Sequence, residues 1–258
     1  MRGDLRALRH AWDVLVVLVR RDQASRYQRT VMGVVWAVAS PLLFLLVFYF
    51  VFGFLFVSRI EHYASYVFIG IVAWTWLQNS VHESVTSIVS NPSLVNQPRF
   101  PIAVLPIATT TSNLINFVFA LPVVIVVLAI EGVMPGLTVA ALPLVMACQF
   151  VLVLALAYIV AAANVAFRDA QYIVPVLLQL VFFSSGVFFD VADLPEAARQ
   201  VLLLNPAVHL LDAYRAILLR DAWPDWTALA LVLAASGVLL ALALRNFQAA
   251  SLHFLEEI

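Results

Sequence analysis

Hydrophobic residues fall into six long runs along the chain, separated by short polar segments. The run over residues 31–58 contains no charged residue. A helix rises about 1.5 Å per residue, so this run reaches farther than the roughly 30 Å of hydrocarbon in a bilayer. Comparable runs cover residues 65–88, 102–130, 136–167, 170–189 and 226–246. The pattern predicts an all-α integral membrane protein, with residues 1–258 forming one domain of six transmembrane helices.

The N-terminal segment shows a different pattern, because its apolar positions recur at helical spacing on one side only. Residues 4–22 carry arginines on the opposite side. The apolar positions are Leu5, Leu8, Trp12, Leu15, Val16 and Val19. An arginine-rich amphipathic helix with a tryptophan is typical of helices that lie in the membrane interface. We predict such a helix on the cytoplasmic leaflet, and a simple anchor is the alternative interpretation.

The polar connection after the second run contains a short segment bounded by prolines. Asn91 and Pro92 favour a turn and a helix start, and Pro98 stops a helix that begins there. We therefore predict a short helix within residues 91–100, lying across the cytoplasmic face. Its candidate contact residues are Asn91, Pro92, Leu94, Val95, Gln97 and Arg99. Two interpretations stay open: a docking element for a soluble partner, and a tight structural connection.

The segment between the last two runs, residues 191–222, has two amphipathic stretches that are too short and too polar to span a bilayer. Asn205 and Pro206 interrupt them. In the second stretch Tyr214 belongs to the apolar positions, whereas Asp212 and Arg215 are polar. A re-entrant helical hairpin that dips into the outer leaflet fits this pattern. A pair of helices lying on the membrane surface is the alternative.

Composition and charge agree with a membrane protein and give it an orientation. The chain is 64% hydrophobic and 11% charged, with a net charge of −1. These values exclude an ordinary soluble domain and give no sign of nucleic-acid binding. Arginines concentrate on the side of the two termini, whereas acids outnumber them on the other side. The positive-inside rule therefore places both termini in the cytoplasm.

Several kinds of chemistry are missing from the sequence. The chain has no lysine, so it cannot contain a phosphate-binding loop of the GxxxxGK[ST] type. The spans carry almost no acids or histidines, which proton- and ion-coupled transporters need. The histidines and the single cysteine, Cys148, have no metal-ligand spacing. We therefore predict no catalytic residue, no cofactor and no metal site on this chain.

A cluster of arginines stands just before the first run. It consists of Arg20, Arg21, Arg26 and Arg29, with Tyr27 between the last two. Such a cluster sets topology through its positive charge. It is also a candidate anion clamp, because guanidinium groups bind phosphate oxygens in pairs. A lipid diphosphate at the cytoplasmic leaflet would suit such a clamp.

Aromatic residues are numerous in the first two runs. Tyr49, Phe52 and Tyr66 lie near the outer ends of the spans and fit an interfacial belt. Trp74 and Trp76 lie about ten residues into the second span, or roughly 15 Å deep by helical rise. Either they pack a helix interface, or they line a path for bulky cargo.

At this point the chain resembles the permease subunits of ATP-binding-cassette exporters for lipid-linked polysaccharides such as O-antigen, teichoic acid and capsule. The resemblance covers nearly the whole length and rests on motifs in a fixed order. These are Arg26-Tyr27-Gln28-Arg29-Thr30-Val31-Met32-Gly33 with Trp36 and Pro41, then Asn91 through Pro101, Phe167-Arg168-Asp169, and Asn205-Pro206.

The resemblance implies a transport subunit rather than an enzyme, in the bacterial inner membrane. Two copies would form a homodimer around a central path for an undecaprenyl-diphosphate-linked polysaccharide. Two ATPase subunits, which hold ATP and Mg, would dock through residues 91–100. The hairpin at 191–222 would act as an outer gate, and the N-terminal helix would lie beside the entrance for the lipid diphosphate. The family's docking segment often carries lysine where this chain has Gln97, which leaves Arg99 as the basic residue there.

Other functions stay open on the sequence alone. An ATP-binding-cassette exporter of drugs or lipids would show nearly the same hairpin and arginine cluster. A membrane-embedded enzyme acting on polyprenyl lipids would need acids at a membrane face, and Glu83 and Asp169 are isolated in sequence. A purely structural scaffold is the remaining possibility.

Overall fold

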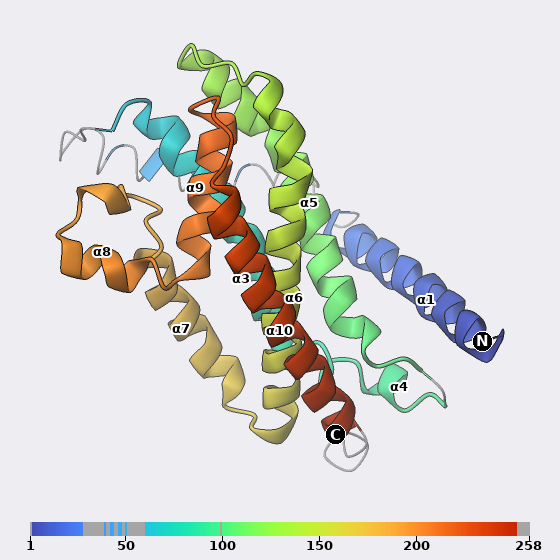
Figure 1. Ribbon diagram of the computed structural model, residues 1–258. Coiled ribbons are helices and arrows are strands. Elements are labelled where there is room, and N and C mark those ends of the chain that lie inside the picture. Colours follow the sequence, from blue (N-terminus) through green and yellow to red (C-terminus); the bar gives the residue numbers. More distant parts are fainter. Residues whose placement is uncertain are drawn as a thin grey trace.

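The computed structural model describes residues 2–27, 39, 42–43, 46–47, 50, 60–98 and 100–251. Over these residues the chain forms helices joined by short connections, and no strand (Figure 1). The predicted all-α class is therefore confirmed for this part of the chain. The predicted span over residues 31–58 lies almost wholly outside the described residues.

The helices follow one another in a simple order. They are α1 (Arg2–Tyr27), α3 (Tyr63–Thr86), α4 (Pro92–Val95), α5 (Val104–Ile130), η2 (Leu137–Ala141), α6 (Leu142–Ala166), α7 (Ala170–Phe183), η3 (Val191–Asp193), α8 (Glu196–Leu202), α9 (Pro206–Leu218) and α10 (Trp226–Ser251). Helix α6 packs against α3 and α10, while α3 also packs against α5 and α9. Helices α7 and α8 stand to one side of this bundle, and α1 stands to the other (Figure 1).

Three of the predicted spans are present as helices long and apolar enough to cross a membrane. They are Val104–Ile130, Leu137–Ala166 and Trp226–Ser251. Helix α3 occupies the second predicted span with 24 residues, although its composition is more polar. These helices show a membrane protein with several spans.

The prediction for residues 170–189 is wrong in its length, because helix α7 ends at Phe183 and has only 14 residues. The chain leaves the helix through Ser184 and Ser185 and turns at Gly186, whose φ is 69°. A positive φ is easily adopted only by glycine. The apolar residues after this turn belong to a loop, so a long run without charged residues did not mean an uninterrupted helix.

The N-terminal helix is longer than predicted, running over Arg2–Tyr27 instead of residues 4–22. Its predicted apolar face is also divided. Leu18 and Val19 are buried in a small core with α5, whereas the Trp12 side chain is 65% exposed. The helix therefore packs on the bundle through its C-terminal half and leaves Trp12 exposed.

Two hydrophobic cores stabilise the bundle. The larger joins α3, α5, α6 and α9 around Trp74 and Trp76. The smaller lies at the other end, where Tyr158 of α6 and Phe247 of α10 meet edge to face with ring centroids 5.0 Å apart. The smaller core also takes in Val95 of α4. Helix α4 is thus attached to the bundle at the end that also holds the C-terminal part of α10 (Figure 1).

Candidate functional site

The hairpin predicted at residues 191–222 is present as η3, α8 and α9, with a sharp bend between the two α-helices. Their axes differ by 94°. Asn205 begins α9, and its side-chain oxygen accepts a hydrogen bond of 3.0 Å from the backbone N–H of Ala207. Pro206 follows at the first helical position, where its missing N–H leaves no bond unmade. Asn205 and Pro206 therefore form the elbow, as the sequence predicted.

Arg215 is the central polar residue of this hairpin, although its side chain is only 4% exposed. Its guanidinium donates to the backbone oxygens of Gly186 and Val187, at 2.9 and 3.0 Å. It also donates to the backbone oxygen and the hydroxyl of Tyr66, at 3.2 and 2.9 Å. The guanidinium carbon lies 3.5 Å from the centre of the Tyr66 ring.

These bonds compensate for the early end of α7. The carbonyls that follow the end of α7 have no partner within the helix, and a buried carbonyl that stays unpaired is costly. Tyr63 and Tyr66 donate to the carbonyls of Phe188 and Phe189, at 3.2 and 3.0 Å. Together with Arg215 they satisfy four consecutive carbonyls. This arrangement could not be predicted from the sequence, because it joins α3 to residues more than 100 positions away.

Gly70 of α3 makes room for the Arg215 guanidinium beside Tyr66. A β-carbon at this position would lie 2.8 Å from a terminal nitrogen of Arg215 and 3.3 Å from the Val187 side chain. Only a glycine on α3 allows the guanidinium to approach this closely.

The remaining candidate gate residues have different surroundings. Asp212 is exposed and pairs with Arg220 at 2.6 Å. Tyr214 is buried, and its ring lies 5.6 Å from that of Phe117. The structure thus brings Tyr66 and Arg215 together and leaves Asp212 at the surface.

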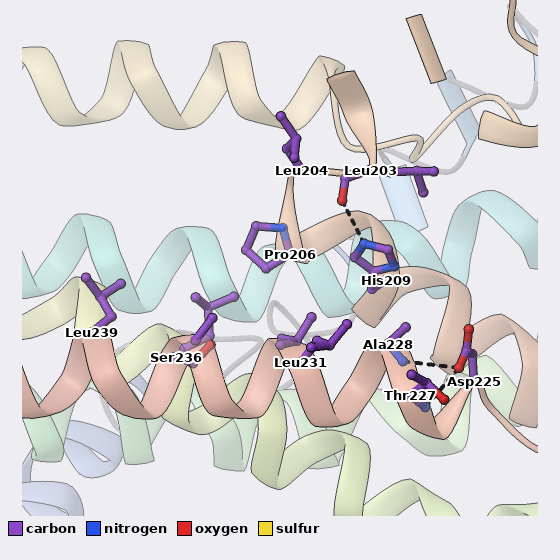
Figure 2. A pocket seen from close by; sticks show the side chains of 13 residues that line it. Leu203, Leu204, Pro206, His209, Asp225, Thr227, Ala228, Leu231, Ser236 and Leu239 are labelled. Carbon is purple, nitrogen blue, oxygen red and sulfur yellow. Dashed lines mark hydrogen bonds between the residues drawn. The ribbon is translucent and has the colours of Figure 1, made fainter. Parts of the chain in front are cut away.

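Two cavities lie beside the hairpin. A largely apolar one of about 470 Å³ separates the elbow from α10, and Leu203, Leu204, Leu231 and Leu239 contribute to its walls (Figure 2). A polar one of about 280 Å³ lies between α8 and α9. The charged residues lining it are Asp190, Arg199, Asp212, Arg215 and Arg220.

The predicted aromatic path is not assembled by the described residues. Trp74 and Trp76 are each 2% exposed and belong to the larger core. The Trp74 ring lies 5.6 Å from Phe182, and the Trp76 ring lies 5.1 Å from Phe117. Of the two interpretations of these tryptophans, packing of helix interfaces is the one that this geometry favours. Tyr49 and Phe52 lie outside the described residues.

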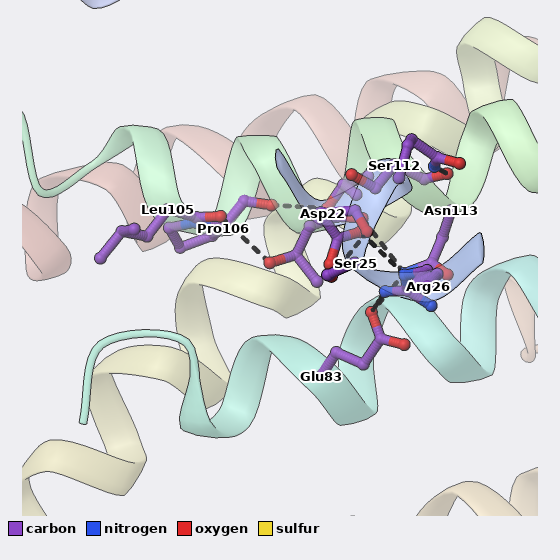
Figure 3. A network of polar contacts seen from close by, with 11 residues as sticks. Asp22, Ser25, Arg26, Glu83, Leu105, Pro106, Ser112 and Asn113 are labelled. Carbon is purple, nitrogen blue, oxygen red and sulfur yellow. Dashed lines mark hydrogen bonds and ion pairs between the residues drawn. The ribbon is translucent and has the colours of Figure 1, made fainter. Parts of the chain in front are cut away.

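At the opposite end of the bundle, a polar network joins α1 to α3 and α5 (Figure 3). Arg26 donates to a carboxylate oxygen of Asp22 at 2.8 Å and of Glu83 at 2.5 Å. Asn113 donates to the same Glu83 oxygen at 2.8 Å. Partial burial opposes the charged form of Arg26, but the bonds and charges of Glu83 and Asp22 outweigh it and raise its pKa. Arg26 therefore already has two anionic partners.

The predicted arginine cluster is consequently not a single group of free cations. Arg20 and Arg21 are exposed, and Arg21 donates to the Asn91 side chain at 3.2 Å. Tyr27 ends α1, and Arg29 lies outside the described residues. The spacing of Asp22 and Arg26, four residues apart on a helix, was a signal for their pairing.

The short helix predicted within residues 91–100 is present, but it is limited to Pro92–Val95. Val95 is buried and Leu94 is half-buried, whereas Pro92, Asn96 and Gln97 are exposed. The Asn91 side chain does not cap this helix, because it accepts from Arg21 and donates to the backbone oxygen of Ser87 at 2.9 Å. Arg99 lies outside the described residues. The arrangement presents a small polar ridge at the end of the bundle.

Comparison with known proteins places this architecture in a family. The model of the ABC-2 type transporter family matches residues 13–219. The chain belongs to the ABC-2 type transporter family. The match begins within α1 and ends just after α9, so α4 and the hairpin helices η3, α8 and α9 with Arg215 lie inside it.

Individual relatives of this ABC-2 type chain are similar along most of its length. The O-antigen export system permease protein RfbA of Myxococcus xanthus is 36% identical over 247 residues, which are 95% of both chains. A protein of the same name from Klebsiella pneumoniae is 27% identical over 81% of both chains. The polysialic acid transport protein KpsM of Escherichia coli is 24% identical over 77% of this chain and 78% of its own.

Proposed function

We propose that this protein is the membrane permease of an ATP-driven exporter for a lipid-linked polysaccharide of the O-antigen type. The observation that carries the proposal is the 36% identity to an O-antigen export permease over 95% of both chains. A similarity of this extent leaves no large part of either chain unmatched. Family membership supports transport as the activity, since the matched family is one of transporters.

The energy for export comes from a separate ATPase subunit in this proposal. The sequence has no lysine and therefore no phosphate-binding loop of its own. Two permease copies pair, and two ATPase subunits that hold ATP and Mg dock on them. The proposed docking ridge consists of Pro92 in α4 and of Asn96 and Gln97 just after this helix, all three exposed.

The proposed topology has six spans with both termini in the cytoplasm of a bacterial inner membrane. Helix α4 and the C-terminal part of α10 lie at one end of the bundle, and the turn between α6 and α7 lies at that same end (Figure 1). The bias of arginines toward this end supports its cytoplasmic placement.

The lipid diphosphate of the substrate enters beside α1. Arg20 and Arg21 are the proposed diphosphate ligands, because both are exposed, whereas Arg26 is bound to Asp22 and Glu83. Guanidinium groups suit this role through their paired hydrogen bonds to phosphate oxygens.

Expression of the chain with its candidate ATPase, followed by purification in detergent, tests this proposal. We expect the two proteins to co-elute and hydrolyse ATP, and export of a lipid-linked glycan after reconstitution into vesicles. Replacing Gln97 by Glu on the exposed ridge should weaken co-elution, whereas replacing the exposed Gln200 of α8 by Glu should not. Purification without any ATPase, together with activity on polyprenyl lipids, would contradict the exporter and favour a membrane enzyme.

A further inference from the structure

The two helices of the hairpin differ sharply in how the bundle holds them. The structure describes all seven residues of α8, and none of them is buried. Ten of the thirteen residues of α9 are buried, and this helix packs against α3, α6 and α10. The bundle therefore holds α9 firmly and α8 only loosely.

Helix α9 is fastened at two levels. In its middle, Arg215 binds Tyr66 of α3 and the loop carbonyls of Gly186 and Val187. Just beyond its end, Asp221 accepts from the Thr138 hydroxyl at 2.7 Å and from the Gly136 backbone N–H at 3.1 Å. Breaking these contacts would leave a buried guanidinium and several carbonyls without hydrogen-bond partners, which is strongly unfavourable.

The segment over residues 190–204 begins just after the Phe189 carbonyl, which accepts from the Tyr66 hydroxyl at 3.0 Å. Near one end Asn205 donates to the Ser185 hydroxyl at 2.9 Å. Close to the same point a ring nitrogen of His209 lies 2.8 Å from the Leu203 backbone oxygen. Between these contacts and Asp190 the segment projects from the bundle as a flap, with α8 at its outer side (Figure 1).

Open space borders this flap on two sides. Leu203 and Leu204 line the apolar cavity of about 470 Å³, and Leu231 and Leu239 of α10 line it from the other side (Figure 2). Arg199 and Leu203 face α9 across the polar cavity of about 280 Å³. Close-packed interiors resist displacement, whereas a segment bordered by cavities can move without first breaking a packed interface.

We propose that, within the hairpin, transport moves only the flap, residues 190–204, while α9 stays fixed to the bundle with Arg215 as its positioning residue. The hinges are the Ser185–Asn205 contact and the chain around Asp190. This inference rests on the exporter function proposed above and narrows the outer gate predicted at 191–222 to its first half.

Hydrogen exchange measured by mass spectrometry on the purified permease–ATPase complex tests the difference in attachment. We expect amides of α8 to exchange at least roughly tenfold faster than those of α9, because α8 can open without unfolding the bundle. Trapping the complex with ATP and vanadate should change exchange within 190–204 and leave α9 unchanged. Equal exchange in both helices, or a change confined to α9, would overturn the proposal.

Reversible cross-linking tests whether the movement is needed. In a Cys148→Ala background, Leu204→Cys and Leu231→Cys place thiols on opposite walls of the apolar cavity. Bridging them with a short bifunctional methanethiosulfonate should reduce glycan export at least tenfold, and a reductant should restore it. The control pair, Thr138→Cys and Asp221→Cys, fixes the end of α9 to η2, and bridging it should leave export unchanged.

Each double variant is compared with itself before bridging, so a folding defect is visible without the reagent. Full export with the flap bridged, or loss of export with α9 bridged, would contradict the inference. Failure of the unmodified complex to export glycan would instead count against the proposed function. In that case the exchange rates of α8 and α9 would still decide whether the flap exists.

Discussion

Two arginines at opposite ends of the bundle have different kinds of hydrogen-bond partner. Arg26 lies between α1, α3 and α5 and pairs with the carboxylates of Asp22 and Glu83. Arg215 is buried and donates to three backbone oxygens and one tyrosine hydroxyl, with no ion pair to a carboxylate among the described residues. The first is held by charge and the second by the geometry of its hydrogen bonds.

This difference decides what each arginine contributes. An ion pair near the surface is weakened by water and salt, so it tolerates change. A buried guanidinium that satisfies several carbonyls is sensitive to small changes in shape, because each carbonyl it loses stays unpaired. We therefore expect the end of the bundle around Arg215 to be rigid and the end around Arg26 to be adjustable.

The largest effect is expected for Arg215→Lys. Lysine keeps the charge but carries its donors on one nitrogen, so it cannot reach carbonyls on both α3 and the 186–187 loop. The free energy of unfolding should fall by about 3 kcal/mol. Unfolding in detergent, followed by tryptophan fluorescence, measures this difference.

The matched control is Arg199→Lys on the exposed α8, for which a change within about 0.5 kcal/mol is expected. If both variants unfolded alike, Arg215 would not hold the hairpin to α3.

A smaller effect is expected for Gly70→Ala, which tests the close approach of α3 to the guanidinium. The new methyl group would lie 2.8 Å from an Arg215 nitrogen, and overpacking of this kind costs about 1–3 kcal/mol. Gly237→Ala in α10 provides the comparison, since nothing lies within 4 Å of its β-carbon position.

Gly237→Ala should be neutral or stabilising by up to about 1 kcal/mol, because alanine favours the helix. The unfolding midpoints of the two variants should be measured under the same conditions: the midpoint of Gly70→Ala should fall, and that of Gly237→Ala should stay unchanged or rise. A destabilised Gly237→Ala with an unaffected Gly70→Ala would show that the contact with Arg215 is loose.

Much of this fold could be predicted from the sequence, because hydrophobic runs and proline positions are local signals. Pro92 correctly indicated the start of α4, and Asn205 with Pro206 correctly indicated the elbow. Span boundaries were less accurate where tertiary contacts decide them. Helix α7 ends at Phe183, inside a run without charged residues, and Arg215 and Tyr66 supply partners for carbonyls that follow.

The candidate site was less predictable for the same reason. Arg215 was named from its place in a polar pattern, but its partners on α3 and at Gly186 and Val187 lie at least 28 positions away in the sequence. Trp74 and Trp76 could be assigned a depth in the membrane, yet sequence alone did not show that their rings meet Phe182 and Phe117 inside the core. Which side of a membrane helix faces its neighbours depends on packing, and hydrophobicity is similar on all sides of such a helix.

The smallest effect is expected for Glu83→Gln, which tests the adjustable end. The amide keeps an oxygen for Asn113 and Arg26 but removes the charge. The side chains of Arg26 and Glu83 are 28% and 31% exposed, and Asp22 remains as a partner, so the free energy of unfolding should fall by about 1 kcal/mol.

Because the Debye length falls from about 10 Å at 0.1 M salt to about 3 Å at 1 M, the loss of stability in Glu83→Gln should shrink as salt is added. Unfolding midpoints of Glu83→Gln and Arg215→Lys, measured at both salt concentrations, complete the comparison: the first should depend on salt and the second should not. A Glu83→Gln loss that is the same at both concentrations would mean that Arg26, like Arg215, is held by hydrogen-bond geometry instead of charge.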